Sequence, residues 1–246
     1  AKDYPMGINS SIYTVNKIMQ TDAGKLQMLM TVYNYSYLME TDADGNIDWG
    51  YRMTADTLTG GKSPGFAWAS VPGGGGGDDD GGICTGKRGN DLSFARFDGD
   101  GNPIWDKRIT LTAYNHATSI LRLGDDKAMF GGYLTNPSGG GYVPFTLEID
   151  EGDGSISWVK YYEGVTLGYA SGVDLMFDEN GDILMNMNYD AGTWGEGGGH
   201  YIFKIDESGN LLDATQLMDD YILKDYNKLK IDGEVVYNYG GYIDQT

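Results

Sequence analysis

Closely spaced aspartates recur along this sequence at places where a cation could bind. They form three groups: Asp42 with Asp44, Asp98 with Asp100, and Asp150 with Asp153. Carboxylates at alternate positions can surround Ca²⁺, but an EF-hand loop also needs glycine at its sixth position and glutamate at its twelfth. Here Gly45 and Gly101 stand at the fourth position, and no such glutamate follows. Because Asp, Asn and Gly also build tight turns, the spacing predicts turns without a cofactor. Calcium at these aspartates is the alternative.

Other reactive groups are sparse or uninformative. His116 and His200 are the only histidines, and they lie far apart in the sequence, whereas a zinc site needs several neighbouring ligands. Glycoside hydrolysis needs only two carboxylates, and with 36 Asp and Glu in the chain no pair stands out. We therefore name no catalytic residue and expect that the protein is not an enzyme.

Aromatic side chains are abundant, with 19 Tyr and 5 Trp. Both residue types combine an apolar ring with a polar group, which suits a binding surface. The candidates that we place on long loops, as ligands for a glycan or a protein, are Tyr114, Tyr142, Tyr169, Trp194 and Tyr221. Sequons at Asn9 and Asn34 are candidate sites of N-glycosylation.

The charge of the chain excludes some partners. The net charge is −19 and the isoelectric point is about 4.2, so binding to nucleic acid or to an anionic membrane surface is not expected. No apolar run is long enough to span a membrane. The sequence starts at Ala1 rather than Met, which is consistent with removal of a signal peptide. We expect an extracellular or cell-surface protein.

An internal repeat organises the chain. Four segments each end in an aspartate, and these aspartates lie 56, 52 and 56 residues apart: Asp42, Asp98, Asp150 and Asp206. Before each aspartate, charged and less polar side chains alternate, which indicates a strand with one buried face. A turn and a second strand follow, and that strand carries Trp49, Trp105, Trp158 or, in the fourth copy, Asp213.

A further hairpin precedes each of these segments, so each unit has four strands, named a, b, c and d. The predicted units are residues 13–53, 66–109, 117–162, 171–217 and 227–246, and the last has only strands a and b. Units of this kind are typical of β-propeller blades. The sequence predicts one all-β domain over residues 1–246. We expect a β-propeller of four-stranded antiparallel blades, with four full repeats and a partial fifth, and therefore five-bladed.

The c–d hairpin resembles the blade repeat of quinoprotein-type (PQQ-like) propellers, in which an Asp, a turn Gly and a Trp mark the same hairpin. The pairs Gly131-Gly132 and Gly240-Gly241 are similar to the Gly-Gly that ends strand b in kelch blades. The resemblance covers nearly the whole chain, and it implies a fold rather than an activity.

Strand direction sorts the loops into two ends. The a–b and c–d turns should share one end of each blade, and because they hold most of the aspartates that end should be strongly negative. The b–c and d–a loops at the other end are longer, less charged and rich in Tyr, Thr, Asn and Gly.

The partial fifth unit leads to the functional prediction. Strand b of this unit, residues 234–243, has an unpaired side unless another strand covers it, and such an edge is a template for pairing with another chain. We expect a non-enzymatic protein with a structural, assembly or adhesion role, as a homo-oligomer or a filament subunit. The alternatives are a glycan-binding propeller module and a propeller hydrolase that acts on carbohydrate.

Overall fold

The computed structural model describes most of the chain, with gaps. The described residues are 13–20, 24–32, 35–53, 67–71, 81–88, 91–98, 100, 102–112, 114–124, 126–136, 138, 141–162, 169–190, 199–218, 223–232 and 235–242. They form eighteen strands, and none of them belongs to a helix long and apolar enough to cross a membrane. The chain divides into two compact units, residues 1–109 and residues 110–246.

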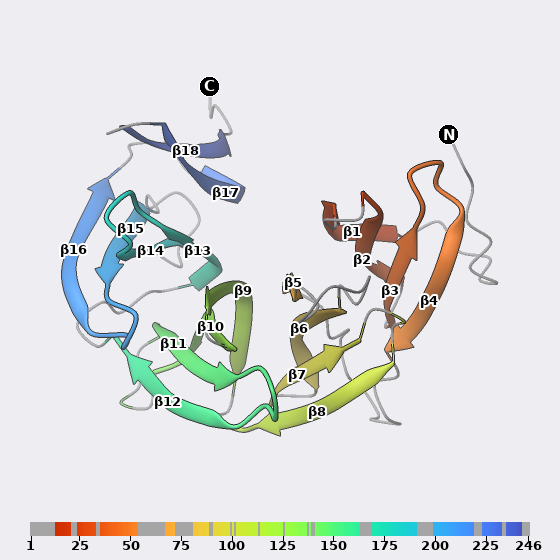
Figure 1. Ribbon diagram of the computed structural model, residues 1–246. Helices are drawn as coiled ribbons and strands as arrows, with labels where there is room; N and C mark the ends of the chain where they lie inside the picture. Colours follow the sequence, from red (N-terminus) through yellow and green to blue (C-terminus); the bar gives the residue numbers. More distant parts are fainter. Residues whose placement is uncertain are drawn as a thin grey trace. The chain divides into compact units, whose positions relative to one another are not determined.

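The first unit contains two four-stranded antiparallel sheets (Figure 1). The first sheet consists of β1 (Tyr13–Gln20), β2 (Leu26–Val32), β3 (Tyr35–Thr41) and β4 (Ile47–Met53). The second sheet consists of β5 (Ala67–Val71), β6 (Gly81–Arg88), β7 (Asp91–Phe97) and β8 (Pro103–Ile109). Each strand pairs with its neighbour in sequence, so strands a to d follow one another across each sheet.

The second unit contains two more sheets of this kind and one smaller sheet. The third sheet consists of β9 (Asn115–Gly124), β10 (Lys127–Thr135), β11 (Tyr142–Asp150) and β12 (Ile156–Tyr161). The fourth consists of β13 (Tyr169–Phe177), β14 (Ile183–Asp190), β15 (Gly199–Ile205) and β16 (Leu211–Met218). The fifth has two strands, β17 (Leu223–Asp232) and β18 (Val235–Tyr242). The predicted all-β fold of four-stranded antiparallel sheets is confirmed, whereas ring closure and blade number stay predictions.

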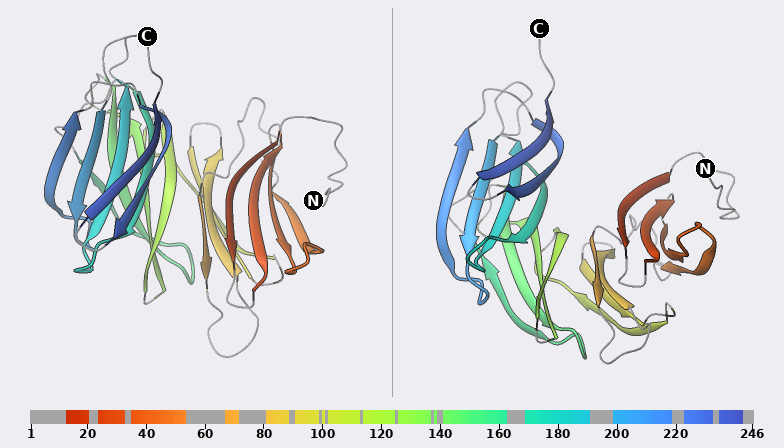
Figure 2. Two further views of the ribbon diagram at one scale, coloured as in Figure 1. Left: turned by 90° about the horizontal axis from the view of Figure 1, so that it is seen from above. Right: turned by 45° about the horizontal axis from the view of Figure 1, so that its top comes forward.

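The a–b and c–d turns lie at the same end of each four-stranded sheet, as predicted. In the first sheet Leu26 pairs with both Gln20 and Thr41, so the turns that follow these two residues are neighbours. In the third sheet Lys127 pairs with both Gly124 and Asp150. Figure 2 shows the strands of each sheet running side by side with their turns at alternate ends.

A β-bulge near the start of strand d recurs in all four sheets and was not predicted. In the first sheet Thr41 pairs with Ile47 and Glu40 with Trp49, so Asp48 is an extra residue. The extra residues of the other sheets are Ile104, Ser157 and Leu212. A bulge bends its strand and increases the twist, so each outer strand changes direction just after the c–d turn.

The bulges bring the motif residues into equivalent positions. Trp49 pairs with Glu40, Trp105 with Arg96, Trp158 with Glu148, and Asp213 with Lys204. This confirms the predicted register of the repeat. Within the first unit Trp49 packs on Leu38 of the first sheet and on Cys84 and Phe97 of the second.

The single cysteine belongs to this core. Cys84 is buried, and burial raises the pKa of its thiol. The thiolate is the reactive form of cysteine, so Cys84 serves as a small apolar core residue.

In the second unit the third and fourth sheets pack against each other through their first strands. Thr118 Oγ1 accepts a hydrogen bond from the Val173 amide at 2.8 Å, and Ser119 Oγ accepts one from the Leu175 amide at 3.0 Å. β9 and β13 therefore lie side by side (Figure 1). The buried residues of this core are Met129, Tyr133, Tyr162, Val173, Leu175, Ile183, Met185, Met187, Phe203 and Ile205.

Gly131 and Gly132 permit close packing between the sheets and within the third sheet, respectively. A Cβ on Gly131 would lie 2.9 Å from the Leu175 side chain, and one on Gly132 would overlap the backbone of His116 and Ala117. The register of β9 and β10 also shifts between these two glycines. Their role in this strand is therefore steric.

Candidate functional site

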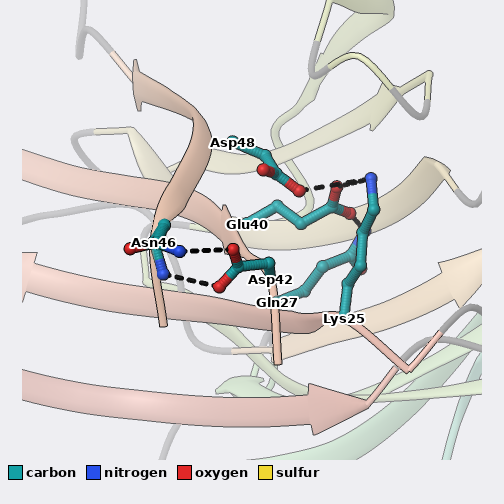
Figure 3. Close-up of polar contacts among 6 residues, drawn as sticks. All are labelled: Lys25, Gln27, Glu40, Asp42, Asn46 and Asp48. Carbon is teal, nitrogen blue, oxygen red and sulfur yellow. Dashed lines mark hydrogen bonds and ion pairs between the residues drawn. The ribbon is translucent and has the colours of Figure 1, made fainter. Parts of the chain in front are cut away.

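The first aspartate of the c–d turn holds the turn together in three sheets. In the first sheet Asp42 Oδ1 accepts a hydrogen bond from the Asn46 amide at 2.7 Å, and its Oδ2 accepts one from Asn46 Nδ2 (Figure 3). Asp98 with Asn102 and Asp206 with Asn210 repeat both bonds. We call this arrangement the Asp–Asn clamp.

The third sheet closes its longer turn differently. Asp150 Oδ1 accepts hydrogen bonds from the amides of Gly152 at 2.7 Å and Asp153 at 3.3 Å, and Asp153 Oδ1 accepts one from the Ser155 amide at 2.7 Å. The turn geometry expected of these aspartates is thus present. Within the described part of the chain no three Asp, Glu, His or Cys side chains gather closely enough to hold a metal ion. Calcium at these turns stays the alternative, and melting with and without a chelator tests it.

Ion pairs connect strand c with the start of strand b at this end of the sheets. Glu40, which is 2% exposed, accepts hydrogen bonds from Lys25 Nζ at 3.0 Å and Gln27 Nε2 at 2.9 Å (Figure 3). At the equivalent position of the third sheet Glu148, 4% exposed, pairs with Lys127 Nζ at 3.1 Å. The lysine partners compensate the charge of these buried glutamates.

The fourth sheet reverses the signs of this pair. Lys204 takes the position of the glutamates, and its Nζ lies 2.9 Å from Asp178 Oδ2 and 2.8 Å from Asp182 Oδ2. Hydrogen bonds first to Asp182 and then to Asp178 raise the pKa of Lys204. An ion pair thus recurs at this position in the first, third and fourth sheets, and its signs are reversed in the fourth.

A second pair ties the c–d turn of the third sheet to its first strand. Glu151 is fully buried, and its two oxygens accept hydrogen bonds from Arg122 Nε at 2.7 Å and Arg122 Nη2 at 2.9 Å. This two-pronged geometry is the strong form of an Arg–carboxylate contact.

Other acidic residues at this end of the sheets are exposed. They are Asp44, Asp48, Asp100, Asp126, Asp153, Glu179 and Glu207.

Exposed apolar side chains gather at the start of strand d. Seven large apolar residues in the described part of the chain are exposed, and five of them occupy the first two positions of a strand d. These five are Ile47 (45% exposed), Ile104 (50%), Ile156 (37%), Leu211 (49%) and Leu212 (51%). Every four-stranded sheet contributes at least one, next to its acidic c–d turn.

An aromatic cluster lies at the opposite end of the third sheet. The ring of the buried Tyr133 stacks on His116 with centroids 5.1 Å apart and meets Tyr142 edge-on at 5.5 Å. Tyr114 lies 4.6 Å from His116 and 5.8 Å from Tyr142. Burial, and then proximity of the other phenols, raises the pKa of both Tyr114 and Tyr133, so these hydroxyls stay protonated.

The structure thus brings together two of the five predicted ligand residues, Tyr114 and Tyr142, with His116 and Tyr133 added. Both also pack against the core of the second unit. Tyr169 opens β13, where its backbone pairs with Asp190. The remaining candidates, Trp194, Tyr221, Asn9 and Asn34, lie outside the described residues.

Sequence reasoning overlooked one motif with catalytic spacing. Gly61-Lys62-Ser63-Pro64-Gly65 has the Gly-x-Ser-x-Gly spacing that presents a nucleophilic serine between a strand and a helix. It also lies outside the described residues.

The fifth sheet differs from the others in strand number, since the described residues give it two strands rather than four. β18 pairs with β17 from Val235 opposite Asp232 to Tyr242 opposite Leu223. Within the described residues no other strand joins β18.

No protein-family model and no curated protein matches this sequence. Similar solved structures include BamB from Moraxella catarrhalis, with 11% identity and a TM-score of 0.41 over 90% of this chain and 77% of that chain. A mutant of Synechocystis apocarotenoid oxygenase has 12% identity and a TM-score of 0.42 over 78% of this chain, which spans less than half (46%) of that one. An endo-1,4-beta-xylanase from Bacteroides thetaiotaomicron has 10% identity and a TM-score of 0.44 over 82% and 75%. At these scores the similarities carry no argument about this chain.

Proposed function

We propose that this protein is a non-enzymatic scaffold of the β-propeller type, with five blades, that assembles with other protein chains through the edge of β18. The observation that carries the proposal is a difference in strand number. Four sheets have four strands, whereas the fifth has two, and within the described residues β18 has a neighbour on one side only.

An edge of this kind has a specific chemistry. Backbone N–H and C=O groups that face away from β17 need partners, and an added strand supplies them along its whole length. The sequence of β18 is rich in Val and Tyr, which favour strands. If each chain both offers this edge and supplies the strand that covers it, the contact is head-to-tail and builds a ring or a filament.

Proline substitution tests strand addition directly. In an antiparallel pair, N–H groups that face the partner alternate with N–H groups that face away. One of the two variants Val236→Pro and Tyr237→Pro therefore removes an outward N–H, and the other removes an N–H that bonds β17. We expect the parent to show a concentration-dependent rise in mass by light scattering, and the outward variant to melt like the parent but to lack this rise.

The inward variant is the matched control, since it should lower the melting temperature. A parent protein that is monomeric at every concentration would contradict the proposal. So would a stably folded outward variant that assembles as the parent does.

The location outside the cell is a separate part of the proposal. It is supported by the sequons at Asn9 and Asn34 and by the acidic composition. Endoglycosidase treatment of the protein from its natural source should lower its mass if these asparagines carry glycans.

A second candidate function, glycan binding, is favoured by the aromatic cluster of the third sheet. Tyr114, His116 and Tyr142 are half-buried, so each keeps part of its ring or its polar atoms accessible. Neutral phenols beside aromatic rings suit the apolar faces and hydroxyl groups of a sugar. Hydrolysis of carbohydrate, the remaining alternative, stays a prediction.

Titration with neutral oligosaccharides, followed by calorimetry, tests this candidate. Tyr142→Ala should weaken binding, whereas Tyr161→Ala, at an exposed tyrosine on the outer strand of the same sheet, should leave it unchanged. Equal binding by both variants would remove the cluster as the site.

A further inference from the structure

The exposed apolar residues at the start of strand d are a surface feature that the proposed function does not explain. A single exposed leucine or isoleucine is ordinary in a folded protein. Here five of the seven large ones occupy the same two positions of a four-stranded repeat. Because the sequences around them differ, the recurrence belongs to the position in the fold.

In the second unit two of these residues lie beside the junction of the third and fourth sheets. A Cβ on Gly209 would lie 2.6 Å from the Trp158 ring, and the Tyr162 hydroxyl donates a hydrogen bond to the Gly209 carbonyl at 3.1 Å. The c–d turn of the fourth sheet therefore rests on strand d of the third. Leu211 and Leu212 follow this turn directly, with about half of each side chain exposed. We call these two residues the junction leucines.

The bulge decides how a partner can bind there. Among the described strands, strand d is the outer strand of its sheet and pairs only with strand c, so its other edge could accept a further strand. Leu212 is the extra residue of the bulge, and a bulge interrupts the ladder of hydrogen bonds at that point. Because the bulge also bends the strand, a straight added strand fits poorly at this point, and we expect a partner to dock on the leucine side chains.

Charge identifies the chemistry of that partner. Asp213 follows the junction leucines and Glu207 precedes them in the same turn, and both are exposed. Nearby, Lys160 is directed to Asn210, with its Nζ 3.4 Å from Asn210 Oδ1. An apolar contact bordered by carboxylates fits a segment that carries Lys or Arg beside its apolar side chains. A second copy of this chain, with net charge −19, is a poor match.

We propose that the junction leucines and their acidic border form a docking surface for a basic amphipathic segment of a partner protein. This surface lies on β16 and is separate from the edge of β18. Docking at this surface and assembly through β18 are therefore independent proposals, and a negative result for one leaves the other untouched.

Binding of a labelled amphipathic Leu/Lys peptide, measured by fluorescence anisotropy at physiological salt, tests the proposal. We expect the double variant Leu211→Ser/Leu212→Ser to weaken binding at least about tenfold, since each leucine loses its buried area in the complex. Ile18→Ser is the matched control, because Ile18 is an equally exposed aliphatic residue on β1 (56%), and it should bind as the parent does.

An Ala/Lys peptide of the same charge separates docking from attraction by net charge alone. We expect it to bind much more weakly than the Leu/Lys peptide. Equal binding of the two peptides, or a double variant that binds like the parent while melting at the same temperature, would overturn the proposal.

Discussion

Asp178 and Asp206 have lowered pKa values, and this couples the fourth sheet to pH. In both, burial acts to raise the pKa and hydrogen bonds outweigh it, led by Lys204 for Asp178 and by Asn210 for Asp206. A lowered pKa in the folded state means that folding favours the ionised form. The resulting stability is complete above the unfolded pKa, about 3.9, and is lost as the pH falls through the lower folded value.

Asp206→Asn should therefore change the acid dependence of stability. We expect the variant to have a lower free energy of unfolding than the parent near neutral pH. This difference should narrow as the pH falls below about 4. Urea unfolding of both proteins across this pH range measures the difference. Asp44→Asn, at an exposed aspartate of the equivalent turn in the first sheet, is the control and should run parallel to the parent. If the difference in free energy of unfolding between Asp206→Asn and the parent does not change with pH, the lowered pKa of Asp206 does not contribute to stability.

The reversed ion pair of the fourth sheet gives a second prediction for single residues. Lys204→Glu places a third carboxylate beside Asp178 and Asp182, so the melting temperature should fall by a few degrees. Adding Asp182→Lys recreates the arrangement of Glu148 and Lys127 in the third sheet and should recover part of the loss. Melting of both single variants and the double variant gives the coupling. If the double variant loses as much melting temperature as the two single variants together, the pairs of the third and fourth sheets are not equivalent.

Sequence reasoning placed the strand c residues correctly and misjudged their surroundings. Alternation put Glu40 and Glu148 opposite the buried side chains, which suggested one buried face. Both are nearly inaccessible, and lysines at the start of strand b compensate their charge. Such partners lie many residues away, and no local pattern shows them. Tyr114 and Tyr142 were found because both flank the long-loop end of one sheet, but their contact through His116 and Tyr133 depends on pairing across strands.

Among the elements, the c–d turn of the fourth sheet makes the most specific contact. Gly209 has a φ of +73° and lies against Trp158 of the third sheet. Gly181 also has a positive φ, +85°, in the a–b turn of the same sheet, with no atom near its Cβ position. The two glycines thus share a backbone requirement and differ in their neighbours.

Alanine substitutions at these glycines measure the contact between sheets. Gly181→Ala should cost about 1 kcal/mol for the left-handed backbone alone. Gly209→Ala should cost about 2 kcal/mol or more, because its methyl group also displaces the Trp158 ring. Chemical unfolding of both variants is the measurement. An equal cost would mean that the contact between turn and tryptophan adds nothing to stability.

The elements were largely predictable and their irregularities were not. Alternation and turn residues placed the hairpins that end at Asp42, Asp98, Asp150 and Asp206, and the structure has a strand c at each. The bulges were missed because an extra residue such as Asp48 or Ser157 reads in the sequence as one more turn residue. The bulge lies beside the exposed apolar start of each strand d.

At the scale of the whole molecule, the repeat ends in a sheet whose outer edge, within the described residues, is available for assembly. Four sheets reach four strands within the chain, and the described part of the fifth reaches two. The sequence predicted the long, Val- and Tyr-rich strand at this place. It could not predict what lies along the outer edge of that strand, because the pairing partner of an edge is set by other segments or other chains.

Hydrogen exchange of the backbone amides of residues 235–242, followed at increasing protein concentration, tests that claim most directly. We predict that alternate amides, those facing away from β17, exchange rapidly in dilute protein and become protected as the mass of the particle rises. Protection of every amide in a dilute monomer would show that this chain covers its own edge. Outward amides that stay unprotected in the assembled particle would show that assembly uses another surface. Either result would contradict assembly through the outer edge of β18.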